Sequence, residues 1–194
     1  MRLLMIGAPG AGKGTQAARI AEHFGVTHIS SGDLFRDHVA RATSIGRAAQ
    51  AYLERGDLVP DAIVMDMLYK PVTGASKAGG YVLDGFPRTV AQAEAAYDVA
   101  KDLGVSVQAA VELEVPADDL LPRLLARGQE SGRADDTEDV IRHRLEVYAE
   151  MTTPLVEYYR QRERLIVVNG ARRPDEVTWS VVVQLQRLQK TLFA

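Results

Sequence analysis

The stretch GAPGAGKGTQ, from Gly7 to Gln16, constrains the fold of this 194-residue chain more than any other part of it. It follows the short apolar run RLLMIG and leads into a segment whose apolar residues have helical spacing. A strand, a glycine loop and a helix in this order form a phosphate-binding loop. The glycines let backbone N–H groups converge on a phosphate, and the start of the helix attracts negative charge. The sequence therefore predicts such a loop here, with Lys13 reaching the terminal phosphates.

The loop departs from the Walker A pattern at one position. A hydroxyl that binds Mg²⁺ normally follows the lysine, but here Gly14 follows it and Thr15 carries the hydroxyl one residue later. We expect Thr15 to bond a more internal phosphate, so that Mg²⁺ rests on nucleotide oxygens and water and no residue binds it directly. Asp84 ends another apolar run, YVLD, and ligands of parallel sheets bind at the carboxyl ends of strands. We therefore expect Asp84 to stand behind the metal, with a turn-capping aspartate as the alternative.

Apolar runs that alternate with helical segments indicate the fold class. Strands are expected at 2–7, 27–30, 81–84, 107–115 and 165–168, and helices at 13–24, 44–55, 89–103, 116–128, from 136 to 162 with a break near 152–154, and from 174 onward. A further helix start is indicated by the capping-box spacing of Ser30 and Asp33. The pattern predicts an α/β protein of three layers, α/β/α, around a central parallel sheet of five strands. The stretches GASKAGG at 74–80 and GQESGRADD at 128–136 are expected to be loops.

Composition excludes several function classes. The formal net charge of -3 argues against a protein that coats nucleic acid, although it permits a local basic cleft. Cysteine is absent, which excludes disulfides and thiolate metal sites. No apolar run approaches the roughly 18 residues of a membrane-spanning helix. We expect a cytoplasmic protein without a membrane or nucleic-acid partner, and a monomer by default.

Five motifs carry a resemblance to a known family. GAPGAGKGTQ, ISSGDLFR, GDLVPD, DGFPRTVAQ and GRADD occur in that order, and the chain resembles adenylate kinases, within the nucleoside monophosphate kinase family, over nearly its whole length. The resemblance implies reversible transfer of a phosphoryl group from ATP to AMP, giving two ADP and maintaining adenine nucleotide balance. It implies Mg²⁺ bound with ATP, and a short lid without zinc. It implies a single P-loop kinase domain over 1–194, with a core at 1–29, 60–125 and 137–194, a helical AMP-binding insertion at 30–59 and a lid at 126–136.

The resemblance also implies roles for individual residues. ATP contacts are implied for Gly10, Ala11, Gly12, Lys13, Gly14, Thr15, Arg123, Arg127 and Gly170. AMP contacts are implied for Ser31, Arg36, Asp57, Leu58, Val59, Gly85, Phe86, Pro87, Arg88, Gln92, Arg133 and Arg144. The catalytic set is Lys13, Arg88, Arg133, Arg144 and Asp84. Ser31 departs from the family, in which threonine is more frequent. Surface helix charges are the alternative for Arg123 and Arg127.

Three other functions compete with this interpretation. A kinase for UMP and CMP is the nearest, but Thr89, Gln92 and the GDLVPD stretch favour AMP. A P-loop hydrolase or switch lacks a clear water-positioning glutamine and a guanine-reading NKxD motif here. A non-catalytic nucleotide-binding scaffold would have no reason to keep the full set of arginines. The family resemblance therefore predicts an enzyme whose cationic cleft neutralises two nucleotide phosphate chains.

Overall fold

The computed structural model describes residues 1–131, 136–162 and 164–192. It contains one parallel sheet of five strands in the order β2-β3-β1-β4-β5. The strands are β1 (Arg2–Ile6), β2 (Thr27–Ser30), β3 (Tyr81–Asp84), β4 (Ala109–Glu114) and β5 (Leu165–Asn169). The predicted five-stranded parallel sheet is confirmed. The chain leaves the central strand β1 between β3 and β4, which is the switch point where such sheets bind ligands.

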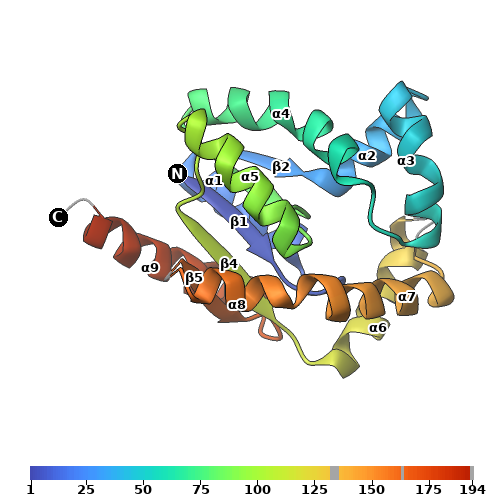
Figure 1. Ribbon diagram of the computed structural model, residues 1–194. Coiled ribbons are helices and arrows are strands. Elements are labelled where there is room, and N and C mark those ends of the chain that lie inside the picture. Colours follow the sequence, from blue (N-terminus) through green and yellow to red (C-terminus); the bar gives the residue numbers. More distant parts are fainter. Residues whose placement is uncertain (132–135, 163, 193–194) are drawn as a thin grey trace.

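Residue alternation along β1 divides the core into two layers of helices. Leu3 and Met5 pack against α1 (Lys13–Phe24) and α9 (Pro174–Leu192) on one face of the sheet. Leu4 and Ile6 belong to the other face, which α4 (Asp61–Lys77), α5 (Val90–Asp102) and α8 (Pro154–Arg160) cover. Side chains of successive strand residues point to opposite faces, so a strand that is apolar throughout requires helices on both sides. The result is the predicted three-layer arrangement (Figure 1).

Four further helices lie together at one end of the molecule. They are α2 (Ser31–Ala40), α3 (Ser44–Arg55), α6 (Ala117–Ser131) and α7 (Glu138–Val147). Figure 1 shows them on the right, while both chain termini lie on the left. Helices α2 and α3 fall inside the predicted insertion at 30–59, and α6 and α7 flank the predicted lid. Among the described residues, no helix combines the length and apolar character needed to cross a membrane.

The predicted loop at 74–80 is wrong for residues 74–77, which form the last turn of α4. The earlier part of this helix was not predicted either, because Pro71 and Gly74 interrupt its helical pattern. The helix is nevertheless held by an apolar stripe that packs on the sheet, formed by Val64, Met67, Leu68 and Ala75. Tertiary packing of such a stripe contributes more to helix stability than the propensity of single residues.

The predicted loop at 128–136 is also wrong in part, because α6 continues to Ser131. Gly128 lies inside this helix, where a Cβ atom would come within 3.0 Å of both the Cβ and the carbonyl oxygen of Asp136. Glycine is therefore needed for close contact with the start of the next helix, rather than for a loop. The residues at 132–135, which include the predicted lid arginine Arg133, lie outside the described residues.

The break in the predicted helix at 136–162 starts earlier than expected. Helix α7 ends at Val147, a π-helical turn follows at Tyr148–Thr152, and α8 begins at Pro154. Proline has no N–H to donate, and its ring clashes with the carbonyl four residues before it. The π turn at Tyr148–Thr152 is wider than an α turn and moves this carbonyl away from the ring of Pro154. The α-helix is therefore interrupted before the proline.

Candidate active site

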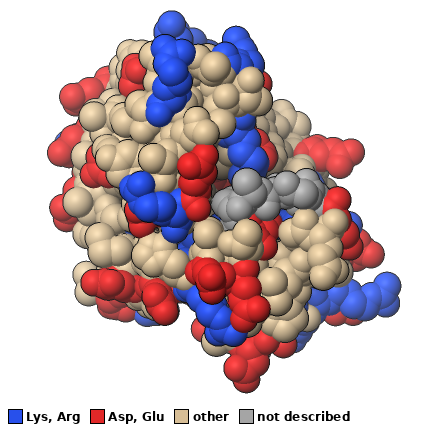
Figure 2. Space-filling view, turned by 90° about the vertical axis from the view of Figure 1, so that its right-hand side faces the viewer, with Lys and Arg blue, Asp and Glu red and all other residues tan. Residues whose placement is uncertain are grey.

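Two connected pockets lie at the end of the molecule that carries α2, α3, α6 and α7. The main cleft, of about 390 Å³, is lined by the phosphate-binding loop, Asp84, the turn at 85–88 and helices α6 and α7. The side pocket, of about 60 Å³, continues beneath α2 and α3. Residues that line both are Gly32, Arg36, Gly56, Leu58, Gly85, Arg88 and Arg144. Figure 2 views the molecule from this end, where separate patches of blue Lys and Arg side chains lie among red Asp and Glu side chains.

The phosphate-binding loop has the conformation that its glycines predict. Gly10 and Gly12 have φ angles of 85° and 90°, in the left-handed region that favours glycine, and α1 begins directly after Gly12. The Lys13 ammonium folds back and donates to the carbonyl oxygens of Gly7 at 2.7 Å and Ala8 at 3.0 Å. The loop thus presents a lysine and a helix N-terminus to the main cleft, the combination that binds phosphate.

Asp84 lies beside this loop at the carboxyl end of β3. A Cβ atom at Gly14 would stand 3.5 Å from Asp84 Oδ2, an ordinary contact distance, so the carboxylate lies directly beside the loop. Asp84 Oδ1 is buried and has no hydrogen-bond partner among the described residues. A buried carboxylate oxygen needs a donor or a cation to offset its lost hydration. The carboxylate therefore fits a hydrated Mg²⁺ carried by a nucleotide. No group of three or more His, Cys, Asp or Glu in the described residues could hold a metal by itself.

The ammonium of Lys13 is surrounded by charged groups from several elements. Burial lowers the pKa of Lys13 from its ordinary value to about 8, since desolvation disfavours the charged form. Asp84 opposes this shift, whereas Arg88, Arg144 and Arg127 lower the pKa further by repulsion. The residue as a whole is only partly buried, but its charged end is enclosed. The four cations reach one site from separate parts of the chain, and together they form a field that favours polyanions.

Binding of ATP should therefore take up protons at alkaline pH. Phosphate oxygens beside the ammonium favour its charged form and raise its pKa. A lysine with a pKa of about 8 is about one tenth protonated at pH 9, so uptake should approach about 0.9 proton there and fall to about 0.1 proton at pH 7. Titration calorimetry in buffers with different ionisation enthalpies measures this uptake. The Lys13→Met variant gives the proton uptake in the absence of the ammonium group. If wild type and variant differed in proton uptake by the same amount at pH 7 and pH 9, the prediction would be contradicted.

Asp136 links two arginines across the gap between α6 and α7. Its carboxylate is fully buried; Oδ2 accepts from Arg127 Nε at 2.8 Å, and Oδ1 accepts from Arg127 Nη2 at 2.7 Å and Arg144 Nη1 at 2.9 Å. The fork of Arg127 is bidentate, which fixes its plane as well as its position. Both arginines line the main cleft, so the buried carboxylate holds two cations at the cleft wall.

The turn at 85–88 closes over the beginning of α2. Gly85 has a φ of 83°, and a Cβ atom there would stand 2.4 Å from the hydroxyl of the buried Ser31. Arg88 Nε donates to the Gly85 carbonyl at 3.0 Å, so its guanidinium stays beside the turn. Arg36 forms an ion pair with Asp33 on α2 and lines both pockets. The predicted monophosphate residues are therefore gathered around the junction of the main cleft and the side pocket.

Phe86 and Gly170, two of the predicted nucleotide contacts, do not line the main cleft or the side pocket. The side chain of Phe86 is buried in the core against α4 and α5, so its side chain faces away from the main cleft. Gly170 lies behind the phosphate-binding loop, since a Cβ atom there would be 3.4 Å from the carbonyl of Ala11. Arg123 lines the main cleft and its Nη1 donates to the Gly170 carbonyl at 3.3 Å. The pair closes the side of the cleft next to the loop.

Comparison with known proteins decides the family. A protein-family model described as adenylate kinase matches residues 5–164, which include the end of β1 and all of β2, β3 and β4. The chain belongs to the adenylate kinase family. It is therefore an enzyme that transfers a phosphoryl group from ATP to AMP, giving two ADP. This assignment excludes the alternatives of a hydrolase, a switch and a non-catalytic scaffold.

Curated relatives match this chain over more than nine tenths of its length. A protein named adenylate kinase from Kocuria rhizophila is 47% identical over 186 residues, which cover 96% of this chain and 99% of the relative. One of the same name from Phocaeicola vulgatus is 39% identical over 188 residues, covering 97% and 100%. A third, from Mycobacteroides abscessus, is 49% identical over 177 residues, covering 91% and 94%. The chain thus has the length of these adenylate kinases.

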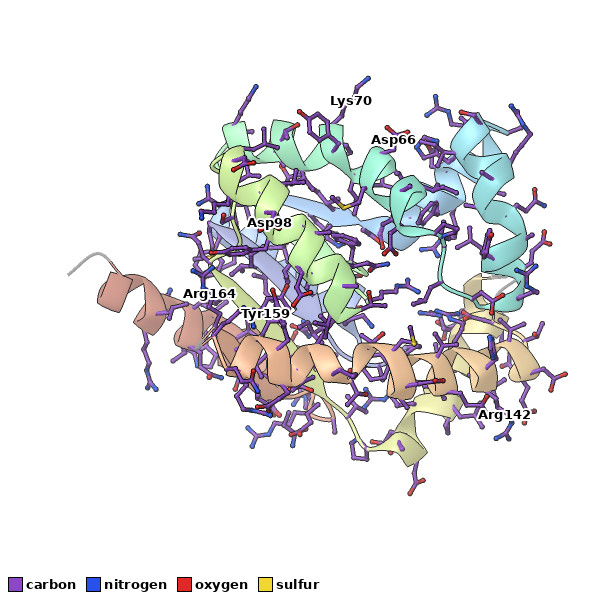
Figure 3. All side chains as sticks on the ribbon, in the orientation of Figure 1. Asp66, Lys70, Asp98, Arg142, Tyr159 and Arg164 are labelled. Carbon is purple, nitrogen blue, oxygen red and sulfur yellow. The ribbon has the colours of Figure 1, made fainter. Side chains whose placement is uncertain are left out.

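One contact joins the predicted AMP-binding insertion to α7, and no pattern in the sequence indicated it. His143 Nε2 lies 2.8 Å from Asp57 Oδ1, and Arg55 Nε donates to Asp57 Oδ2 at 2.7 Å. These hydrogen bonds, from His143 first and then Arg55, hold the pKa of Asp57 below its usual range. No local pattern indicates this role for His143, because its partner lies 86 residues away along the chain. Its neighbour Arg142 does point into solvent (Figure 3).

Proposed function

We propose that ATP lies on the phosphate-binding loop side of the main cleft and that AMP enters the side pocket. The observation that best supports this proposal is that Lys13, Arg88, Arg127 and Arg144 converge on one site. The side pocket adds Phe35, Leu53, Leu58, Val59 and Val64, whose apolar side chains suit the faces of a base. The two phosphate chains would meet end to end at the junction between the pockets, which is lined by Arg36, Arg88 and Arg144.

The reaction needs positioning and charge neutralisation more than acid–base chemistry. An oxygen of the AMP phosphate attacks the γ-phosphorus of ATP, and the bond from that phosphorus to the bridging oxygen breaks, leaving ADP on each side. No side chain needs to remove a proton, because the AMP phosphate is already ionised. Lys13 and the arginines offset the charge on the transferred group. Arginine suits this role because its planar fork binds phosphate oxygens in pairs.

Mg²⁺ belongs to the proposal as a partner of ATP. Asp84 would hold its hydration shell, and Thr15 would bond an inner phosphate. The ion supplies positive charge to the phosphate oxygens when bound. Arg133 is included by family resemblance as a lid arginine that closes over the phosphates and excludes water. The boundaries of the lid, the monomeric state and the cytoplasmic location stay predictions from the sequence.

Acceptor specificity provides the test. The protein is incubated with Mg-ATP and, in separate reactions, with AMP, GMP, UMP, CMP or no acceptor, and products are followed by phosphorus NMR. We expect ADP to accumulate quickly with AMP only. When ADP is supplied alone, we expect the reverse reaction to form ATP and AMP. Equal turnover with UMP or CMP would contradict the placement of adenine in the side pocket. Release of inorganic phosphate without an acceptor would contradict the exclusion of water.

A further inference from the structure

The side chain of Gln92 is buried in the side pocket with both ends of its amide already bonded. Its Oε1 accepts from the backbone N–H of Arg88 at 2.7 Å, and its Nε2 donates to Asp61 Oδ1 at 2.7 Å. Thr89 caps α5 and accepts from the backbone N–H of Gln92 at 3.1 Å, which fixes where the side chain leaves the helix. Asp61 belongs to a different element, the first turn of α4.

These two partners permit one orientation of the amide. The backbone N–H of Arg88 can only donate, and an ionised carboxylate can only accept. If the amide turned over, its NH₂ group would face the N–H, and its oxygen would face the carboxylate of Asp61. Both contacts would become repulsive, and the amide of Gln92, which is buried although Asp61 itself is exposed, would lose two hydrogen bonds. The orientation of Gln92 is therefore set by its surroundings before any ligand enters.

The remaining hydrogen-bonding capacity of the amide distinguishes purines. Oε1 keeps one lone pair and Nε2 keeps one N–H, in a fixed order. Adenine presents an N6 amino donor and an N1 acceptor, which can pair with an amide in this manner. Hypoxanthine and guanine present an O6 acceptor and an N1–H donor, the reverse order. A 6-oxopurine whose position is set by its ribose and phosphate would need the amide to turn over.

We propose that Asp61 is a positioning residue that holds the Gln92 amide in the orientation that pairs with adenine and opposes 6-oxopurines. The inference rests on the proposed placement of AMP in the side pocket. It assigns selectivity to a carboxylate outside the residues expected to contact the nucleotide. Asp61 acts by making the wrong orientation of Gln92 costly, which is how an interface rejects a close analogue.

The Asp61→Asn variant tests this role, because an amide can either donate to or accept from Gln92. The kcat/KM values for AMP and IMP are measured with saturating Mg-ATP, since these acceptors differ only at the six-position and N1. We expect the preference for AMP over IMP to fall about tenfold or more, the cost of one charge-assisted hydrogen bond. The change should lie mainly in KM. The ratio does not depend on the fraction of folded protein, so weakening of α4 alone would leave it unchanged.

Asp66→Asn is the matched control. Asp66 is exposed on the same helix, five residues further on, and is labelled in Figure 3. Its substitution should leave the preference unchanged. The Gln92→Ala variant separates the inference from the proposed function. If Gln92→Ala weakens AMP selection but Asp61→Asn keeps the wild-type preference, the role of Asp61 is overturned. If Gln92→Ala has no effect on either acceptor, the placement of the base in the side pocket fails instead.

Discussion

Replacing Arg88 with alanine should lower turnover by about 10²–10³-fold, the effect of removing one preorganised charge stabiliser. Arg88 lies at the junction of the two pockets, and its Nε is held by the Gly85 carbonyl at 3.0 Å. It lies close enough to Lys13 to lower the pKa of that lysine. A cation at this place meets the phosphoryl group between the two nucleotides, where negative charge is greatest in the transition state. The kcat at saturating ATP and AMP measures the effect.

The control for this variant is Arg142→Ala. Arg142 is another arginine at the same end of the molecule, but it pairs with Glu138 on the exposed face of the same helix. We expect its loss to change turnover by less than about twofold, because exposed ion pairs contribute little. Arg88→Lys should recover part of the activity, since it keeps the charge and loses the planar fork. A loss below threefold for Arg88→Ala would show that the turn at 85–88 does not face the transferred group.

Local patterns in the sequence were sufficient for the sheet and the phosphate-binding loop. Four of the five strands are short runs rich in apolar residues, β2 (THIS) being the exception, and β1 passes directly into the glycines that shape the loop. The helix α4 was missed because Pro71 and Gly74 weaken its pattern, although its buried stripe is complete. The end of α6 was missed because Gly128 resembles a helix stop. In the structure this glycine allows close contact with Asp136, a reason that no local pattern contains.

Contacts between distant segments account for most of what the sequence could not show in the site. The family resemblance implied a role for Gln92 but none for Asp61, the last residue of the GDLVPD motif, which lies 31 residues before Gln92 on another helix. It indicated the stretch at 57–59 but not His143, which bonds Asp57 across the molecule. Neither partner has a distinctive spacing of its own. Such polar pairs depend on how α3, α4, α5 and α7 pack, so only the folded arrangement reveals them.

The second large effect should come from Asp136→Ala, which should lower the free energy of unfolding by about 3 kcal/mol. Removing one partner of a buried ion pair leaves an uncompensated charge and typically costs about 3–5 kcal/mol. The lower end applies because one third of the Arg127 side chain is exposed, whereas the Arg144 side chain is only 16% exposed. Without the carboxylate, the two guanidinium groups would repel each other across the junction of α6 and α7. Urea unfolding at pH 7 measures the loss.

Glu138→Ala is the control for this variant, because Glu138 pairs with Arg142 on the exposed face of α7 and should contribute less than about 1 kcal/mol. Asp136→Asn should lie between the two, since the amide oxygen can still accept one hydrogen bond. A loss for Asp136→Ala no larger than that for Glu138→Ala would show that the arginines do not depend on this carboxylate. Saturating ATP should reduce the difference between wild type and Asp136→Ala, because its phosphates can neutralise the two arginines that the variant leaves facing each other.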